Sequence, residues 1–137
     1  MLTIEPSVYD SLIEHSRKDA PVEACGYLAE KNGIVTLAFP LTNTDASSEH
    51  YSLDPKEQFE TVRHIRSKGM KLRAVYHSHP QTPARPSQED IRLAYDPNLS
   101  YVIVSLADKA PVIKSFIIVK GDVKTEEIEI VPDTVNE

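Results

Sequence analysis

Apolar and charged residues alternate with helical spacing near the start of the chain. Val8, Leu12 and Ile13 share one face of a helix, and charged residues lie between them. This pattern predicts a helix over about residues 5–18, which ends before Pro21.

Capping residues predict two further helices. Asp54 can cap the second helix, Glu57 follows three residues later as in a capping box, and Gly69 can end this helix. Ser87 can cap a third helix over about residues 88–95, with acidic side chains near its positive end.

Strand-like segments fill much of the remaining sequence. They predict strands at about residues 26–30, 34–39, 72–76, 100–106, 112–119 and 123–131. Asn32-Gly33 separates the first two strands and favours a tight hairpin. Gly121-Asp122 separates the last two and predicts a second hairpin, whereas the polar residues 40–53 predict a loop.

The order of these elements predicts one mixed α/β domain over residues 1–137, in which a single mixed sheet is flanked by helices. A length of 137 residues suits one domain. Hydrophobic residues make up 40% of the chain and charged residues 26%, as is typical of a globular protein.

The net charge of −6 is concentrated at the C-terminal end. Residues 1–120 carry 14 basic and 15 acidic side chains (−1), whereas residues 121–137 carry one and six (−5). In this acidic strand and tail, Ile128 and Ile130 alternate with glutamates, which predicts an edge strand with one solvated face. A nearly neutral body with an acidic end argues against nucleic-acid binding.

Neither a membrane span nor an internal disulfide is indicated. The longest uninterrupted apolar run is four residues, from Phe116 to Val119, which is too short for a transmembrane helix. The N-terminal residues lack the basic and apolar regions of a secretory signal. Because Cys25 is the only cysteine, we expect a reducing, cytoplasmic location.

The most informative segment is His77-Ser78-His79-Pro80. Two histidines separated by one residue at the end of a strand project to the same side if the backbone stays extended. Zinc is often bound by neutral imidazoles, and Asp90, one turn into the third predicted helix, can supply a carboxylate as third ligand. Three protein ligands with an open fourth position form a catalytic zinc site, whose water has a pKa of about 7.

Such a site also needs a group that accepts a proton and returns it. Glu23 lies just before the first hairpin strand and is the candidate, provided that the fold brings it within hydrogen-bond reach. Ser87 can donate its hydroxyl to the oxyanion of a tetrahedral intermediate. The alternatives are a solvated loop carboxylate for Glu23, and helix capping alone for Ser87 and Asp90.

Together these residues resemble a known motif. The JAMM metalloproteases, whose domain is also called JAB or MPN, carry a glutamate, then H-[ST]-H-P, and then S-x-x-D, with seven residues between the second histidine and the serine. Here residues 80–86 are those seven, and Ser87 to Asp90 completes the pattern. Residues 21–26 and 51–59 also resemble bacterial members, and the similarity covers most of residues 5–120.

The resemblance implies an MPN/cytidine-deaminase-like architecture and a metallopeptidase that holds one zinc ion with a bound water. It implies zinc ligation by His77, His79 and Asp90, general acid/base catalysis by Glu23, oxyanion stabilisation by Ser87, and support of the motif by Ser78 and Pro80.

The resemblance also implies a substrate class. Family members hydrolyse an amide after the C-terminal glycine of a ubiquitin-like protein, and bacterial single-domain members act on small sulfur-carrier proteins that end in Gly-Gly. The chain has little room for the insertions of eukaryotic deubiquitinases, which favours a minimal prokaryotic enzyme, and Ser78 argues against the DNA-repair-associated branch. Two alternatives are a non-catalytic MPN-type interaction module and a metal hydrolase of small amides.

Two further features allow more than one interpretation. Cys25 is more simply a small buried residue than a nucleophile or a regulatory thiol. The basic stretch at residues 63–73 is typical of a solvated helix face, and it could instead steer an acidic carrier protein. The sequence indicates neither the oligomeric state nor the released group.

Overall fold

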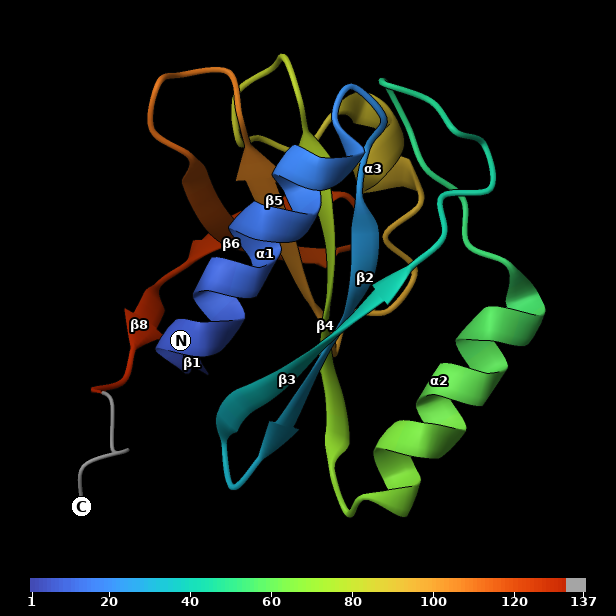
Figure 1. Ribbon diagram of the computed structural model, residues 1–137, viewed down its shortest axis with the longest axis vertical. Coiled ribbons are helices and arrows are strands. Elements are labelled where there is room, and N and C mark those ends of the chain that lie inside the picture. The colour runs from blue at the N-terminus through green and yellow to red at the C-terminus, as the bar shows by residue number, and fades with distance from the viewer. Residues whose placement is uncertain (133–137) are drawn as a thin grey trace.

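One curved sheet runs through the described part of the chain (Figure 1). The structure, a computed structural model, describes residues 1–132. Its eight strands lie in the spatial order β7-β6-β5-β4-β2-β3-β1-β8. They are β1 (Leu2–Ile4), β2 (Cys25–Lys31), β3 (Ile34–Leu41), β4 (Lys71–His79), β5 (Ser100–Ser105), β6 (Val112–Val119), β7 (Asp122–Glu126) and β8 (Ile128–Ile130).

The sheet is mixed. Strand β1 runs parallel to β3 and β8, and β4 runs parallel to β5, whereas the other pairs are antiparallel. Strand β4 lies between β2 and β5, so its backbone is held extended from both sides up to its C-terminal end. The predicted mixed α/β domain is confirmed.

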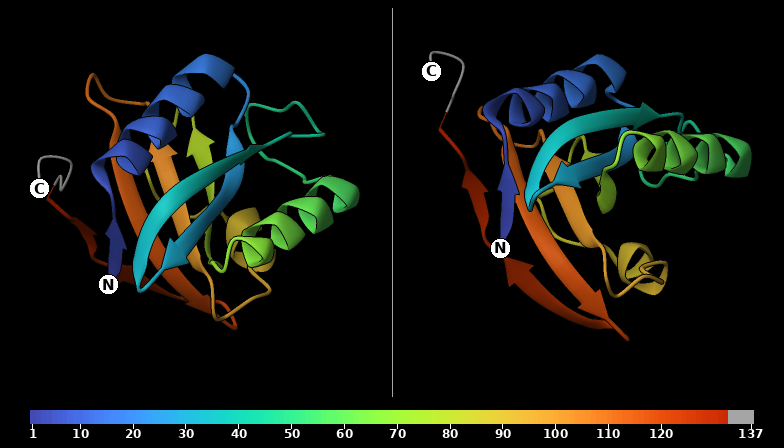
Figure 2. Two further views of the ribbon diagram at one scale, coloured as in Figure 1. Left: turned by 60° about the horizontal axis from the view of Figure 1, so that its bottom comes forward. Right: turned by 90° about the horizontal axis from the view of Figure 1, so that it is seen from below.

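Three helices cover the two faces of the sheet (Figure 2). Because successive strand residues point to opposite faces, Tyr76 of β4 joins the apolar cluster of Leu12, whereas Val75 joins that of Ile65. On the face of Val75, a third cluster contains Ile103 of β5 and Ile91. These helices are α1 (Pro6–Asp19), α2 (Pro55–Ser67) and α3 (Gln88–Arg92).

The hairpin turns follow their backbone requirements. Asn32 and Gly33 have φ values of 55° and 82°, the left-handed conformation that a two-residue hairpin turn needs. The second hairpin turns at Lys120 and Gly121, with φ values of 50° and 82°, and not at Gly121-Asp122 as predicted. Gly121 therefore occupies the second turn position, as Gly33 does.

The second helix begins at the predicted cap, although the capping box is incomplete. The Asp54 carboxylate accepts a hydrogen bond from the Glu57 amide at 3.2 Å. The Glu57 carboxylate, however, accepts hydrogen bonds from the amide and hydroxyl of Thr42 at 2.8 and 3.1 Å. This contact joins α2 to the loop that follows β3.

Other differences from the sequence prediction lie at the sheet edges and in α3. Strand β1 was not predicted, because its three residues become a strand only through pairing with β3 and β8. The single strand predicted at residues 123–131 is two strands, of which β7 pairs with β6 and β8 with β1 at the opposite edge. Helix α3 ends at Arg92 and not near residue 95, because the chain turns there toward β5.

A largely buried carboxylate links β7 to the central strands and to the N-terminus. Glu126, at the end of β7, accepts hydrogen bonds from the hydroxyls of Ser100 and Ser115 at 2.6 and 2.8 Å. It also pairs with the guanidinium of Arg73 at 3.1 Å and with the amino group of Met1 at 3.5 Å. Arg73, one of the cations in the basic stretch, thus has a structural partner.

Strand β8 is an edge strand as predicted, although Ile130 is 45% exposed. Residues 133–137 of the predicted acidic tail lie outside the described residues. Among residues 1–132, no helix combines the length and the apolar character needed to cross a membrane.

Candidate metal centre

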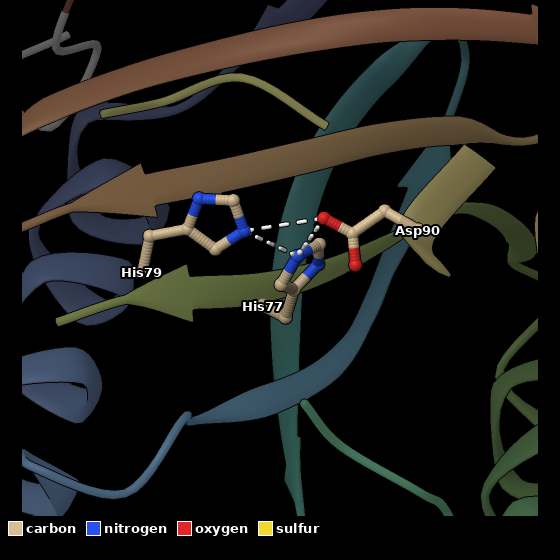
Figure 3. A group of neighbouring side chains, drawn as sticks. All are labelled: His77, His79 and Asp90. Carbon is tan, nitrogen blue, oxygen red and sulfur yellow. Dashed lines mark hydrogen bonds and ion pairs between the residues drawn. The ribbon is translucent and has the colours of Figure 1, made fainter. Parts of the chain in front are cut away.

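Three side chains converge at the C-terminal end of β4 (Figure 3). The Nε2 atoms of His77 and His79 lie 3.1 Å apart, and Asp90 Oδ2 lies 3.1 and 3.2 Å from them. A tetrahedral ion with bonds of about 2.0–2.1 Å separates its ligand atoms by about 3.3 Å. The spacing and the donor types therefore suit a zinc ion with one open position.

The extended backbone of β4 places both imidazoles on one side. His77 lies opposite Cys25 of β2 and Ile103 of β5, and His79 lies opposite Ser105. Both histidines are buried, with exposed fractions of 4% and 5%. The sequence spacing thus becomes a pair of ligands because neighbouring strands keep the backbone straight.

The proline-containing loop after β4 orients His79. The Nδ1–H of His79 donates to the Pro83 carbonyl at 2.8 Å, and this bond turns the ring so that Nε2 faces His77 and Asp90. The Ser105 hydroxyl donates to the Thr82 carbonyl at 2.6 Å and holds the loop against β5.

Ser87 and Asp90 form a reciprocal cap at the start of α3. The Ser87 amide donates to Asp90 Oδ2 at 2.9 Å, and Ser87 Oγ accepts from the Asp90 amide at 3.0 Å. Burial would raise the pKa of Asp90, but hydrogen bonds from His77 and His79 hold it well below its ordinary value. Asp90 therefore remains ionised, as a metal ligand requires. Capping and metal ligation are compatible here.

Glu23 lies beside this cluster and is buried, with an exposed fraction of 3%. This burial excludes the alternative of a solvated loop carboxylate. Its Oε1 atom has no hydrogen-bond partner among residues 1–132. Burial raises the pKa of Glu23 to about 8, while the nearby charge of His79 lowers it and that of Asp90 raises it further.

The Glu23 segment is tied directly to the strand that carries the histidines. The Ala24 amide donates to Ser78 Oγ at 2.8 Å, and the Ser78 amide donates to the Ala24 carbonyl at 2.9 Å. Ser78 is fully buried and points away from the two imidazoles. The burial and hydrogen bonds of Ser78 agree with the prediction that this residue supports the motif. Pro80 directly follows His79 and begins the proline-containing loop.

Gly26 lets this segment approach β4 closely. A Cβ atom at this position would lie 2.5 Å from both the Phe39 carbonyl oxygen and the Tyr76 ring. Position 26 therefore has to be glycine, because any side chain there would prevent β2 from packing at this distance. This steric requirement explains why the segment at residues 21–26 ends in glycine.

A cavity of about 330 Å³ opens beside the cluster, with His77 and Asp90 in its wall. Its other lining residues include Tyr51, Leu53, Gln58, Leu93, Tyr95, Tyr101, Ile103 and Ile118. None of the cavity-lining residues is a lysine or arginine. Sequence reasoning missed this cavity, because its walls come from several loops, two helices and three strands with no common spacing.

Cys25 agrees with the simpler interpretation. Its thiol is fully buried beneath α2, and Sγ lies 3.8 Å from the Leu41 carbonyl oxygen. Burial raises the pKa of this thiol to about 12, so it carries no thiolate near neutral pH.

Comparison with known families agrees with the geometry. Residues 5–119 match the family described as prokaryotic homologs of the JAB domain. The chain therefore belongs to the prokaryotic JAB family, which carries the JAB/MPN (JAMM) domain.

Two relatives carry the names of enzymes. A CysO-cysteine peptidase of Mycobacterium tuberculosis is 35% identical over 134 residues, which cover 96% of this chain and 92% of the relative. A desampylase of Haloferax volcanii is 35% identical over 111 residues, which cover 76% and 80%. These homologues and the His-His-Asp cluster confirm the expectation of a JAMM-type metallopeptidase.

Two solved structures confirm the fold. A protein of Desulfitobacterium hafniense superposes with a TM-score of 0.87 at 43% identity, covering 97% of this chain and 94% of that one. A JAB1/MPN domain protein of Archaeoglobus fulgidus superposes with a TM-score of 0.67 at 22% identity, covering 95% and 97%. The predicted MPN architecture is thus confirmed.

Proposed function

We propose that this protein is a zinc-dependent peptidase that hydrolyses the amide after the C-terminal glycine of a small ubiquitin-like or sulfur-carrier protein. The observation that carries the proposal is the convergence of His77, His79 and Asp90 beside the buried carboxylate of Glu23, whose Oε1 has no hydrogen-bond partner within residues 1–132. This arrangement combines an open metal site with a proton acceptor.

His77, His79 and Asp90 are assigned as the ligands of one zinc ion. When bound by these residues, a zinc ion would supply Lewis acidity for the substrate carbonyl and would lower the pKa of a water molecule to about 7. The hydrogen bond that His79 donates to the Pro83 carbonyl and the one that Asp90 accepts from the Ser87 amide keep the two ligand side chains in place, which reduces the reorganisation that metal binding costs.

Glu23 is assigned as the general base and then the general acid. Its carboxylate accepts a proton from the attacking water and returns it to the amine that leaves. A cation beside Glu23 favours the ionised carboxylate, which opposes the effect of burial on its pKa. Since Oε1 has no partner in residues 1–132, this oxygen is free for the reaction.

Ser87 is assigned to the oxyanion. Its Oγ accepts a hydrogen bond from the Asp90 amide, and the hydroxyl hydrogen is still available to donate. Donation to the developing negative charge lowers the barrier to amide hydrolysis.

The names of the relatives support the substrate class. The relative in Mycobacterium tuberculosis is a CysO-cysteine peptidase, and another in Thermus thermophilus is a probable TtuB-protein conjugate cleaving protease. We assign the partner as a carrier that ends in Gly-Gly, because two glycines let an extended tail come close to the buried ligands. The buried free thiol of Cys25 agrees with a cytoplasmic location.

Cleavage of a defined fusion tests the proposal. A small carrier protein ending in Gly-Gly is extended by one cysteine or by a short peptide, incubated with the zinc-loaded protein, and weighed by mass spectrometry. We expect release of the extension and a carrier that ends at glycine, with no release when Gly-Gly is replaced by Ala-Ala. An intact fusion with the zinc-loaded protein would indicate a non-catalytic interaction module, and turnover of small amides alone would indicate a general amide hydrolase.

A further inference from the structure

We propose that Asn43 is a positioning residue that holds Glu23 against the metal site through the loop of residues 43–52. The inference rests on the proposed function of Glu23 as the proton-transfer group. It assigns a role to a loop that sequence reasoning interpreted only as polar.

The side-chain amide of Asn43 is fully used in hydrogen bonds. Its Nδ2 donates to the main-chain carbonyls of Glu23 and His50, both at 3.1 Å. A third carbonyl, that of Ser47, lies 3.4 Å from the same nitrogen. Its Oδ1 accepts from the amides of Asp45 and Ser52 at 3.1 and 3.2 Å.

Both main-chain polar groups of Glu23 are bound by this loop. The Glu23 amide donates to the Ser47 carbonyl at 2.8 Å, and the Glu23 carbonyl accepts from Asn43. Ser78 holds the next residue, Ala24. The backbone of Glu23 is therefore clamped between the loop and β4.

The clamp matters because the Glu23 carboxylate has little to orient it. Its Oε1 makes no hydrogen bond within residues 1–132, so its position depends on the backbone that carries it. A catalytic group needs its geometry within about 0.5 Å, and supporting hydrogen bonds are the usual means of reaching this precision. Asn43 supplies such a bond at the residue itself.

The same loop also reaches the metal ligands. Tyr51 follows His50, and its ring stacks on His77 with centroids 4.8 Å apart. Residues 42–54 contain no helix or strand, so the backbone has no regular ladder to hold this path. The side chain of Asn43 holds the loop backbone instead, because one amide group can donate and accept hydrogen bonds at the same time.

Two substitutions separate positioning from general folding of the loop. Asn43→Asp keeps an acceptor for Asp45 and Ser52 but removes the donor to Glu23, whereas Asn43→Ala removes both. Thr44→Val is the control, since it deletes only the hydroxyl donation to the Ser52 carbonyl at 3.2 Å in the same loop.

We expect both Asn43 variants to bind zinc at the wild-type ratio and to lose kcat by roughly 10–100-fold with little change in KM. Hydrogen exchange of the Glu23 amide, measured by NMR, should accelerate by roughly tenfold, while exchange in β4 and β5 stays unchanged. Thr44→Val should match the wild type in each measurement.

Three results would overturn the proposal. The first is a wild-type kcat together with wild-type hydrogen exchange of the Glu23 amide in Asn43→Asp. The second is a loss of kcat in Thr44→Val as large as that in the Asn43 variants. The third is failure of both Asn43 variants to fold, which would make Asn43 a folding residue only. The exchange measurement needs no substrate. If the wild type cleaves no carrier fusion, the proposed function fails while the clamp of Glu23 by Asn43 is still tested.

Discussion

The ring of Tyr51 lies stacked on the imidazole of His77, with centroids 4.8 Å apart and an interplanar angle of 28°. The contact joins a residue of an irregular loop to a metal-ligand candidate in the central strand. Tyr51 also lines the cavity beside the cluster, so one side chain both orients His77 and shapes the space next to it.

Replacing Tyr51 by alanine should therefore affect metal binding and substrate binding together. We expect Tyr51→Ala to weaken zinc affinity by roughly tenfold and to raise KM, because the ring no longer restricts His77 or closes the cavity. Tyr51→Phe keeps the stacked ring and should behave like the wild type. Competition with a zinc chelator measures the affinity, and equal affinities in all three proteins would show that the stacking has no such effect.

The assignment of the metal ligands predicts a simple stoichiometry. The wild type should contain one zinc ion per chain, whereas His77→Ala and Asp90→Ala should contain almost none, because two protein ligands hold zinc poorly. His64→Ala is the matched control, since His64 is exposed on α2 and contacts Phe39. Elemental analysis of the purified proteins measures the ratio, and equal zinc in all four would contradict the ligand set.

The role of Glu23 predicts a separation of binding from turnover. Glu23→Gln should keep zinc and a similar melting temperature but lose kcat by roughly 10²–10⁴-fold, because the amide cannot accept the proton. Single-turnover cleavage of the carrier fusion measures the loss. Substantial turnover by this variant, with zinc present, would assign the proton transfer to another group.

The Glu126 carboxylate, which links β7 to the central strands and to the N-terminus, predicts acid sensitivity. Burial raises the pKa of Glu126, but hydrogen bonds from Ser100, Ser115 and Arg73 lower it more, so its pKa lies below the ordinary value. A lowered pKa in the folded state stabilises the fold above the pKa of the unfolded chain. This stabilisation is lost as the pH falls through the folded-state pKa.

Glu126→Gln should therefore lower the free energy of unfolding at pH 7 by about 2 kcal/mol and flatten its decrease below about pH 4.5. Glu129→Gln is the control, because Glu129 is exposed on β8, the next strand along the chain. Urea unfolding from pH 3 to pH 8 measures both effects. The same pH dependence in the wild type and in Glu126→Gln would show that the carboxylate contributes nothing in its ionised form.

Much of the fold was predictable because it depends on local rules. The apolar periodicity of α1, the Asp54 cap of α2 and the Asn32-Gly33 hairpin each involve residues close in sequence, and the structure contains all three. Strand β1 and the separation of β8 from β7 could not be found in this way, because β1 and β8 pair with segments that are distant in the sequence.

The sequence by itself determined the donor types and their local spacing. In His77-Ser78-His79 an extended strand directs both imidazoles to one side, and the reciprocal cap of Ser87 and Asp90 follows from a four-residue motif. These features need only the geometry of one strand and one helical turn.

Only the tertiary structure decided that α3 meets the end of β4, that Glu23 is buried beside the cluster, and that Tyr51 covers His77. Asn43 became significant in the same way, through hydrogen bonds to Glu23, twenty residues earlier in the chain. The physical reason is that burial and contact between distant segments arise from the packing of the whole sheet, which no short sequence window contains.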